Sequence, residues 1–214
     1  MHRGVGGGKG RVLCLMRENG LLSPSRVGRP RGPRVHDGTI ITSSPDEMWG
    51  TDGTRIWTRQ EGLAWVFVAV DHHTDDCVGI HAAQIGTPFE ALEPVRQGVR
   101  EHFGRIGAGI VRGLKLRHDW GSPYSSHDFQ SEIEFLGFES SPSFAYAPEG
   151  NGVAERFIRT LKENLLWIRT FDTVEELRQE LLAFRRRYNE SWLIERHGHR
   201  TQSEVRASFR EGAA

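Results

Sequence analysis

The chain has 214 residues, 37% of them hydrophobic and 26% charged, which is typical of a globular protein with one sizeable core. No apolar run approaches the roughly 18 to 20 residues that cross a bilayer, and no signal peptide is indicated. The two cysteines lack CxxC spacing and indicate neither a zinc site nor a disulfide framework. We therefore expect a cytoplasmic protein without a membrane partner. The formal net charge is zero, but the first 36 residues hold eight basic residues and one acidic residue, a basic arm that would bind phosphates or remain a solvated tail.

The first 38 residues have the composition of an appendage to a folded domain. Residues 1–10 are rich in glycine, and Arg11–Asn19 favours a short helix that stops at Gly20. Residues 23–36 are rich in Pro, Gly and Arg, as linkers are. We expect the folded domain to begin near Thr39.

Residues 48–83 predict three consecutive strands, at 48–57, 64–70 and 77–83. Short links between them indicate an antiparallel meander. The link between the second and third strands holds two His and two Asp residues that resemble a metal-ligand cluster, but their position favours a polar turn. These residues are His72, His73, Asp75 and Asp76.

The remainder of the chain alternates predicted helices with two short strands. The helices are predicted at 88–103, 125–135, 151–170 and 173–188, and the strands at 113–118 and 138–141. Ser125 with Asp128, and Thr173 with Glu176, have the spacing of helix N-terminal caps. The element order predicts one α/β domain with a five-stranded mixed sheet flanked by helices. The apolar stripe of the 151–170 helix is Ala154, Phe157, Ile158, Leu161, Leu165 and Ile168.

Three dispersed carboxylates suggest a divalent-metal site. Asp52 lies in the first predicted strand, Asp119 ends the fourth, and Glu155 lies in the first turns of the long helix. Mg²⁺ prefers oxygen ligands and usually takes one or two protein carboxylates per ion. Spacing alone decides little in a chain with 28 acidic residues, so the local context of each acid has to decide.

That context resembles the three signatures of the DDE integrase core, which retroviral integrases share with bacterial insertion-sequence transposases. The matching segments are WGTD at 49–52, HDWGSPY at 118–124 and NGVAERF at 151–157, with 35 residues between Asp119 and Glu155. The second-reading-frame (OrfB) type of transposase is the most similar, and the resemblance extends from about Arg11 to Arg206.

The resemblance implies an RNase H-like fold, with a catalytic core at 39–190 and a C-terminal tail at 191–214. Residues 1–38 would then be a remnant of a helix-turn-helix region with its linker. The implied activity is cleavage and transfer of DNA strands at transposon ends with two Mg²⁺ or Mn²⁺ ions. Asp52 would bridge both ions, and Asp119 and Glu155 would each complete one coordination shell.

The same resemblance implies that Asn151, Arg159 and Lys162 contact DNA. Arg159 and Lys162 follow Glu155 by one and two helical turns, where a cation would neutralise phosphate; a solvated helix face is the alternative. Asn151 would serve equally as a plain helix cap. The implied partners are transposon ends and target DNA, a second copy of the chain on that DNA, and the product of an upstream reading frame.

The match departs from the family in two respects. Only the last helix of a helix-turn-helix region remains, which suggests a truncated product or one frame of a split transposase. Trp120 and Pro123 also replace glutamines that are common in the second signature. Two alternatives stay open: an inactive remnant that binds DNA or a partner, and an RNase H-like nuclease that only hydrolyses.

Overall fold

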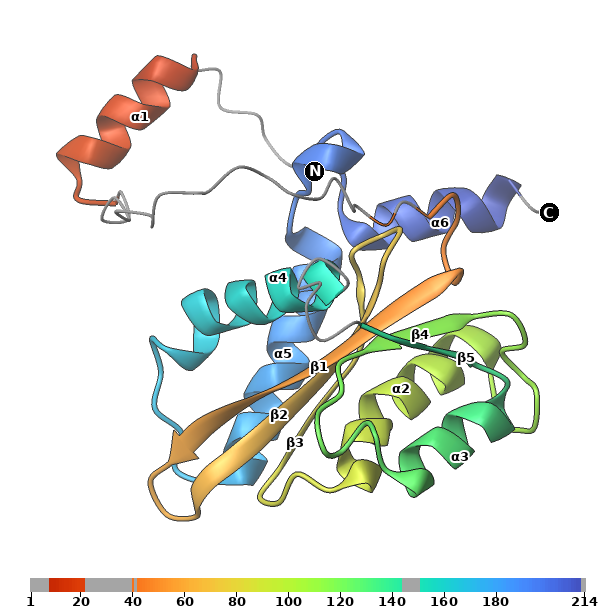
Figure 1. Ribbon diagram of the computed structural model, residues 1–214. Coiled ribbons are helices and arrows are strands. Elements are labelled where there is room, and N and C mark those ends of the chain that lie inside the picture. The colour runs from red at the N-terminus through yellow and green to blue at the C-terminus, as the bar shows by residue number, and fades with distance from the viewer. Residues whose placement is uncertain (1–7, 22–39, 41, 144–150, 213–214) are drawn as a thin grey trace, which may run out of the picture. The chain divides into compact units, whose positions relative to one another are not determined.

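The computed structural model describes residues 8–21, 40, 42–143 and 151–212, and the chain divides into two compact units, residues 1–37 and 38–214 (Figure 1). In the first unit, helix α1 spans Lys9–Glu18, close to the predicted range. It ends before Gly20, whose φ of +64° does not continue a helix. The predicted linker at 23–36 lies outside the described residues.

A five-stranded mixed sheet forms the centre of the second unit (Figure 1). Its strands are β1 (Met48–Thr58), β2 (Gly62–Asp71), β3 (Cys77–Ala83), β4 (Lys115–His118) and β5 (Glu139–Pro142). In the order β3-β2-β1-β4-β5, the first three are antiparallel neighbours, and β4 and β5 run parallel to β1. The predicted meander and the mixed sheet are confirmed. β4 begins later than predicted because Gly113 has a φ of +91°, which a strand does not allow.

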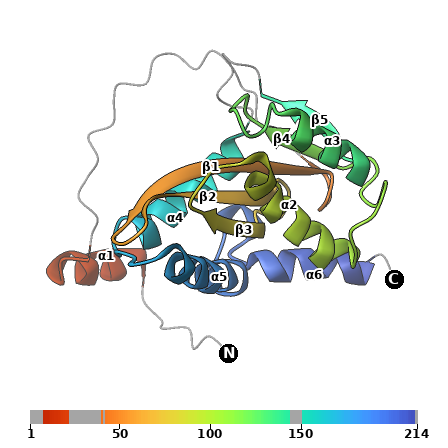
Figure 2. The same ribbon diagram turned by 90° about the horizontal axis from the view of Figure 1, so that it is seen from below.

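Helices pack on both faces of the sheet. α2 (Pro88–Phe103) and α3 (His127–Leu136) share a buried cluster with Phe67 of β2. α4 (Gly152–Leu161) and α5 (Val174–Ser191) share the other cluster with Val68, the next residue of the same strand. Figure 2 shows α5 alongside β3. Within the described ranges, no helix has the length and apolar content needed to span a bilayer.

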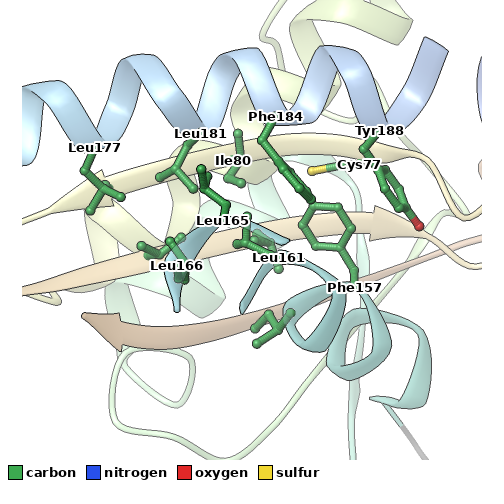
Figure 3. Packing of buried hydrophobic residues seen from close by; sticks show 14 of the residues in the cluster. Cys77, Ile80, Phe157, Leu161, Leu165, Leu166, Leu177, Leu181, Phe184 and Tyr188 are labelled. Atoms are coloured by element: carbon green, nitrogen blue, oxygen red, sulfur yellow. The ribbon is translucent and has the colours of Figure 1, made fainter. Parts of the chain in front are cut away.

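The helix predicted at 151–170 changes its geometry halfway. From Lys162 to Leu166 it is a π-helix, η2, whose wider turn brings both Leu165 and Leu166 into the core. Figure 3 shows these leucines facing the side chains of α5. Ile168 is 68% exposed, so its prediction as a core residue is wrong, because a uniform 3.6-residue period does not continue past Lys162.

Side-chain caps begin the helices that the sequence marks with Ser and Thr. Thr173 Oγ1 accepts a hydrogen bond from Glu176 N at 3.1 Å, which confirms the predicted cap of α5. At α3 the cap is Ser126, whose hydroxyl accepts from Phe129 N at 3.2 Å. The predicted cap, Ser125, is therefore one residue too early.

Side chains of α5 occupy the outer edge of β3. They donate hydrogen bonds to backbone carbonyl groups that a sixth strand would otherwise use. These contacts are Arg178 to Ala82 (2.7 Å), Arg185 to Val78 (3.0 Å) and Asn189 to Cys77 (3.0 Å). The edge of the sheet is thereby closed by the same helix that covers its face.

The C-terminal segment contains a helix that the sequence analysis does not predict, α6 (Gln202–Gly212), which follows a short 3₁₀ helix at Glu195–His197. Arg206 of α6 is buried and forms ion pairs with Asp46 (2.8 Å), Asp71 (3.4 Å) and Asp76 (2.9 Å). The polar turn between β2 and β3 is confirmed, and it lies buried under this segment. Burial raises the pKa of Asp71 and its neighbour Asp76 adds to the rise, while the Arg206 charge opposes it.

We expect Arg206→Gln to lower the free energy of unfolding by about 3 kcal/mol, because it leaves the buried carboxylates of Asp71 and Asp76 without their cation. Urea denaturation at pH 7 measures the change. Arg210→Gln, one turn further along α6 at an exposed position, is the matched control and should change the value by less than about 0.5 kcal/mol. Equal effects of the two substitutions would contradict the role of the ion-pair network.

Candidate active site

The pairing of β1 determines where Asp52 lies. β4 pairs with β1 over three residues that end at Gly50, and Asp52 follows two residues later. Asp52 is opposite Val68 in the antiparallel pair, and Val68 shares a buried cluster with Phe157 of α4. Because directly opposed residues point to the same face of a sheet, Asp52 lies on the face that α4 covers. Its half-buried carboxylate accepts a hydrogen bond from Gly53 N at 2.7 Å.

Asp119 follows the last residue of β4 and is exposed. In the parallel register Gly50 pairs with Arg117, so two further residues on each strand set Asp119 level with Asp52. Asp119 Oδ1 accepts a hydrogen bond from Gly121 N at 2.8 Å. A Cβ at residue 121 would lie 2.8 Å from that same oxygen, so a larger residue there would displace the Asp119 carboxylate.

Glu155 lies in the first turn of α4 and is exposed. The helix start is fixed by Asn151, whose Nδ2 donates to Thr51 O at 2.9 Å and whose side chain is buried. Gly50 makes this approach possible, because a Cβ there would lie 2.7 Å from Asn151 Oδ1. Asn151 makes no side-chain capping bond. Its side chain instead ties the start of α4 to β1, the strand that carries Asp52.

The three carboxylates influence one another electrostatically. The pKa of Asp52 is raised to about 6, mainly by burial, with further contributions from the negative charges of Asp119 and Glu155; a backbone hydrogen bond and Lys162 oppose the rise. The pKa of Glu155 is also raised, by burial and then by Asp119, while Arg159 opposes it. The site therefore accumulates negative charge that a bound cation would relieve.

The donor set fits a divalent cation of the magnesium type. Carboxylate oxygens are its preferred ligands, with one or two per ion. Asp52 and Asp119 line a common pocket of about 420 Å³, which leaves room for water and phosphate. In the part of the chain that the structure describes, no three acidic, His or Cys side chains already stand together as a ligand group.

Comparisons with known proteins identify the kind of domain that carries this site. The integrase core domain family matches residues 136–201, which include Glu155. The chain is 27% identical over 160 residues to the putative transposase InsD for insertion element IS2E of Escherichia coli (strain K12), covering 74% of this chain and 72% of that protein. Residues 136–201 therefore match an integrase core domain, and the chain is homologous to insertion-sequence transposases over 160 residues.

A second transposase of Escherichia coli, InsD for insertion element IS2A/D/F/H/I/K, is also 27% identical over 160 residues. These residues make up 74% of this chain and 52% of that protein. The chain thus spans about half the length of this relative.

Solved structures share the fold of this integrase core. The catalytic core domain of BIV integrase superposes with a TM-score of 0.55 at 20% identity, covering 78% of this chain and 98% of that one. The HTLV-2 integrase catalytic core domain in complex with magnesium gives 0.56 at 16% identity, covering 77% and 98%. These likenesses confirm the RNase H-like fold.

Buried aromatic groups support the turn that carries Asp119. His118 is 1% exposed, and its Nδ1 lies 2.7 Å from Asp119 O while its Nε2 lies 3.0 Å from Ser140 Oγ on β5. Tyr124 is also buried, with its ring edge-on to Phe129 at 5.2 Å. The turn is therefore anchored to β5 and α3, which restricts where the Asp119 carboxylate can lie.

The pocket beside Asp52 and Asp119 is also lined by Arg55 and Trp65, which the sequence alone does not single out. Arg55 of β1 lies directly opposite Trp65 of β2. The predicted hairpin is the feature of the sequence that could have identified this pair, because the two residues become cross-strand neighbours once the register is known. The turn length that sets the register is not determined by hydrophobic pattern alone.

We expect Asp52→Asn to stabilise the metal-free protein at neutral pH. The folded-state pKa of Asp52, about 6, lies above the ordinary value of 3.8, so the protonated form favours folding below about pH 4 and this contribution is lost as pH rises through 6. Relative to that of the wild type, the free energy of unfolding of the variant should rise by on the order of 2 kcal/mol between pH 4 and 7. Urea denaturation across that range measures it; a pH-independent difference would contradict the assignment.

Proposed function

We propose that this chain is the catalytic part of a DDE transposase that cleaves DNA strands at insertion-sequence ends and joins them to target DNA. The observation that carries the proposal is the strand register, which sets Asp119 level with Asp52 beside the helix start that leads to Glu155. The homologous transposases and the integrase core supply the reaction class, a phosphoryl transfer in which water or a 3′-hydroxyl attacks phosphorus.

Asp52, Asp119 and Glu155 would hold two Mg²⁺ or Mn²⁺ ions, with Asp52 shared between them. Such ions, when bound, stabilise negative charge on the attacking and leaving oxygens. The Gly53 and Gly121 amides each donate to one oxygen of the neighbouring Asp, which orients the carboxylate and leaves its second oxygen for a ligand. The negative charges of Asp119 and Glu155 beside Asp52 support this assignment, because a nearby dication would offset them.

Arg159 and Lys162 would bind the DNA backbone. Arg159 is exposed and its charge acts on the pKa of Glu155, and that of Lys162 acts on the pKa of Asp52. Both cations therefore lie within electrostatic reach of the acidic site, where they would neutralise phosphates of the bound strand. Asn151, which is buried against β1, has the different role of holding the helix start.

The partners of this reaction would be two transposon ends and a target duplex. Bringing two ends together favours a homo-oligomer assembled on DNA. The product of an upstream reading frame would supply the reading of terminal DNA sequence.

A strand-transfer assay tests the proposed function. The protein, Mn²⁺ and a labelled duplex with the terminal inverted repeats should give cleaved and joined products. Asp119→Asn should lower their yield by more than about 100-fold, because it removes a metal ligand. The exposed Asp128→Asn is the matched control and should leave the yield unchanged. Cleavage without joining would indicate a nuclease, and binding without cleavage an inactive remnant; either result contradicts the proposal.

We expect the double substitution Arg159→Gln/Lys162→Gln to weaken DNA binding in a salt-dependent way. Loss of two phosphate contacts should reduce the slope of log affinity against log salt concentration by about 2. Fluorescence anisotropy between roughly 50 and 200 mM salt measures the slope. Arg186→Gln, at an exposed position of α5, is the control. An unchanged slope would show that these two side chains do not contact phosphate.

A further inference from the structure

The pocket beside the acidic residues contains groups that metal binding does not require. Its volume, about 420 Å³, is within the range of roughly 300–1,000 Å³ that is typical of ligand sites. Asp52 and Asp119 form part of its lining. The other lining residues are Gly53, Arg55, Trp65, Gly86, Gly121, Ser122, Pro123 and Tyr124.

The pocket exists because one edge of β1 is open. β4 stops pairing at Gly50, so in the described structure no strand adjoins this edge at Asp52 or Arg55. Those two side chains are opposite Val68 and Trp65 respectively, and therefore lie on opposite faces of the sheet. Because Asp52 and Arg55 line one pocket, the pocket extends around the open edge of β1. It connects the acidic site to the face of the sheet on which Trp65 lies.

Glycines keep the space around Trp65 tightly defined. A Cβ at Gly86 would lie 2.7 Å from the Trp65 ring, and a Cβ at Gly53 would lie 3.0 Å from the Phe67 ring. Trp65 stacks on Phe67 with ring centroids 5.5 Å apart and planes within 4°. The indole is therefore held in one orientation before any ligand binds, which lowers the entropic cost of binding.

Arg55 brings a positive charge to this wall. Its guanidinium carbon lies 5.2 Å from the centre of the Trp65 ring, within the range of a cation–π contact. The side chain is exposed, and it forms no ion pair with a carboxylate in the described parts of the chain. This cation is therefore available to a phosphate group.

We propose that this Arg55–Trp65 pocket binds one unpaired nucleotide of the DNA strand that passes through the acidic site. Arg55 contacts its phosphate, and its base lies against the wall that Trp65 forms. The inference rests on the proposed function, because the strand has to pass Asp52 and Asp119 to reach the pocket.

The chemistry of the wall favours an unpaired nucleotide over a duplex segment. In a duplex, both faces of an internal base are covered by its neighbours and each base is held in its pair, so a single base can enter this pocket only after it has left its pair. Aromatic side chains combined with cations are the usual means of binding single strands, and they tolerate any base. The pocket therefore selects for fraying of the DNA end and not for its sequence.

Binding measurements without metal test the proposal separately from catalysis. Two duplexes are compared, identical except that the terminal 2-aminopurine nucleotide is paired in one and unpaired in the other. We expect the unpaired end to bind about tenfold more tightly and its fluorescence to be quenched. Trp65→Leu and Arg55→Gln should each remove most of this preference.

Trp57→Leu is the matched control, because Trp57 lies on β1 two residues after Arg55, is 70% exposed and does not line the pocket. It should retain the full preference. Thermal melting checks the folding of each variant, and the exposed Arg55 provides a second test if Trp65→Leu does not fold. Equal binding of the two duplexes by the wild type, or equal losses in Trp57→Leu and Trp65→Leu, would overturn the proposal.

The outcome also separates this inference from the proposed function. A preference for the unpaired end without Asp119-dependent cleavage supports the pocket and contradicts the transposase chemistry. Asp119-dependent cleavage without the preference contradicts the pocket alone.

Discussion

The short parallel pairing between β1 and β4 is the constraint on which the site depends. β1 is central in the sheet, yet β4 follows it only as far as Gly50. The strands begin to separate where Asp52 and Asp119 come level, and this separation leaves room between two central strands for solvent and ligand. A longer β4 would satisfy more backbone groups, but it would close that space. The short strand is held by other means, including the bond between His118 and Ser140 across to β5.

Two groups of carboxylates in this fold, one buried and the other half-buried to exposed, have opposite electrostatic surroundings. Asp71 and Asp76 face the buried Arg206, so their charges are compensated within the chain and bind α6 to the sheet. Asp52 has Asp119 and Glu155 as its charged neighbours and only Lys162 as an opposing charge. The first group has the cation that it needs for stability. The second lacks one, and in the proposed function it obtains that cation from solution.

The sequence predicts much of the fold because its signals are local. Alternation and apolar runs locate β1 to β3 within a few residues, and the Thr173 cap locates α5. What it does not predict depends on contacts between distant parts of the chain. The π-helix at Lys162 breaks the period that a uniform helix assumes. α6 is held by Arg206 through carboxylates more than 100 positions away, which no helix pattern reveals. The roles of the acids remain predictions from resemblance and geometry, and the pairing of Arg55 with Trp65 required the register.

The occupied edge of β3 limits how copies of this protein can associate. An open sheet edge can pair with a strand of another molecule, and the proposed homo-oligomer would bring several copies close together. Here Arg178, Arg185 and Asn189 already use the outward carbonyl groups. Before a sheet could continue from one copy into another, these side chains would have to release the β3 carbonyl groups. Copies of the protein would therefore associate through side-chain surfaces, which distinguish a correct neighbour from an incorrect one. Backbone pairing does not make that distinction.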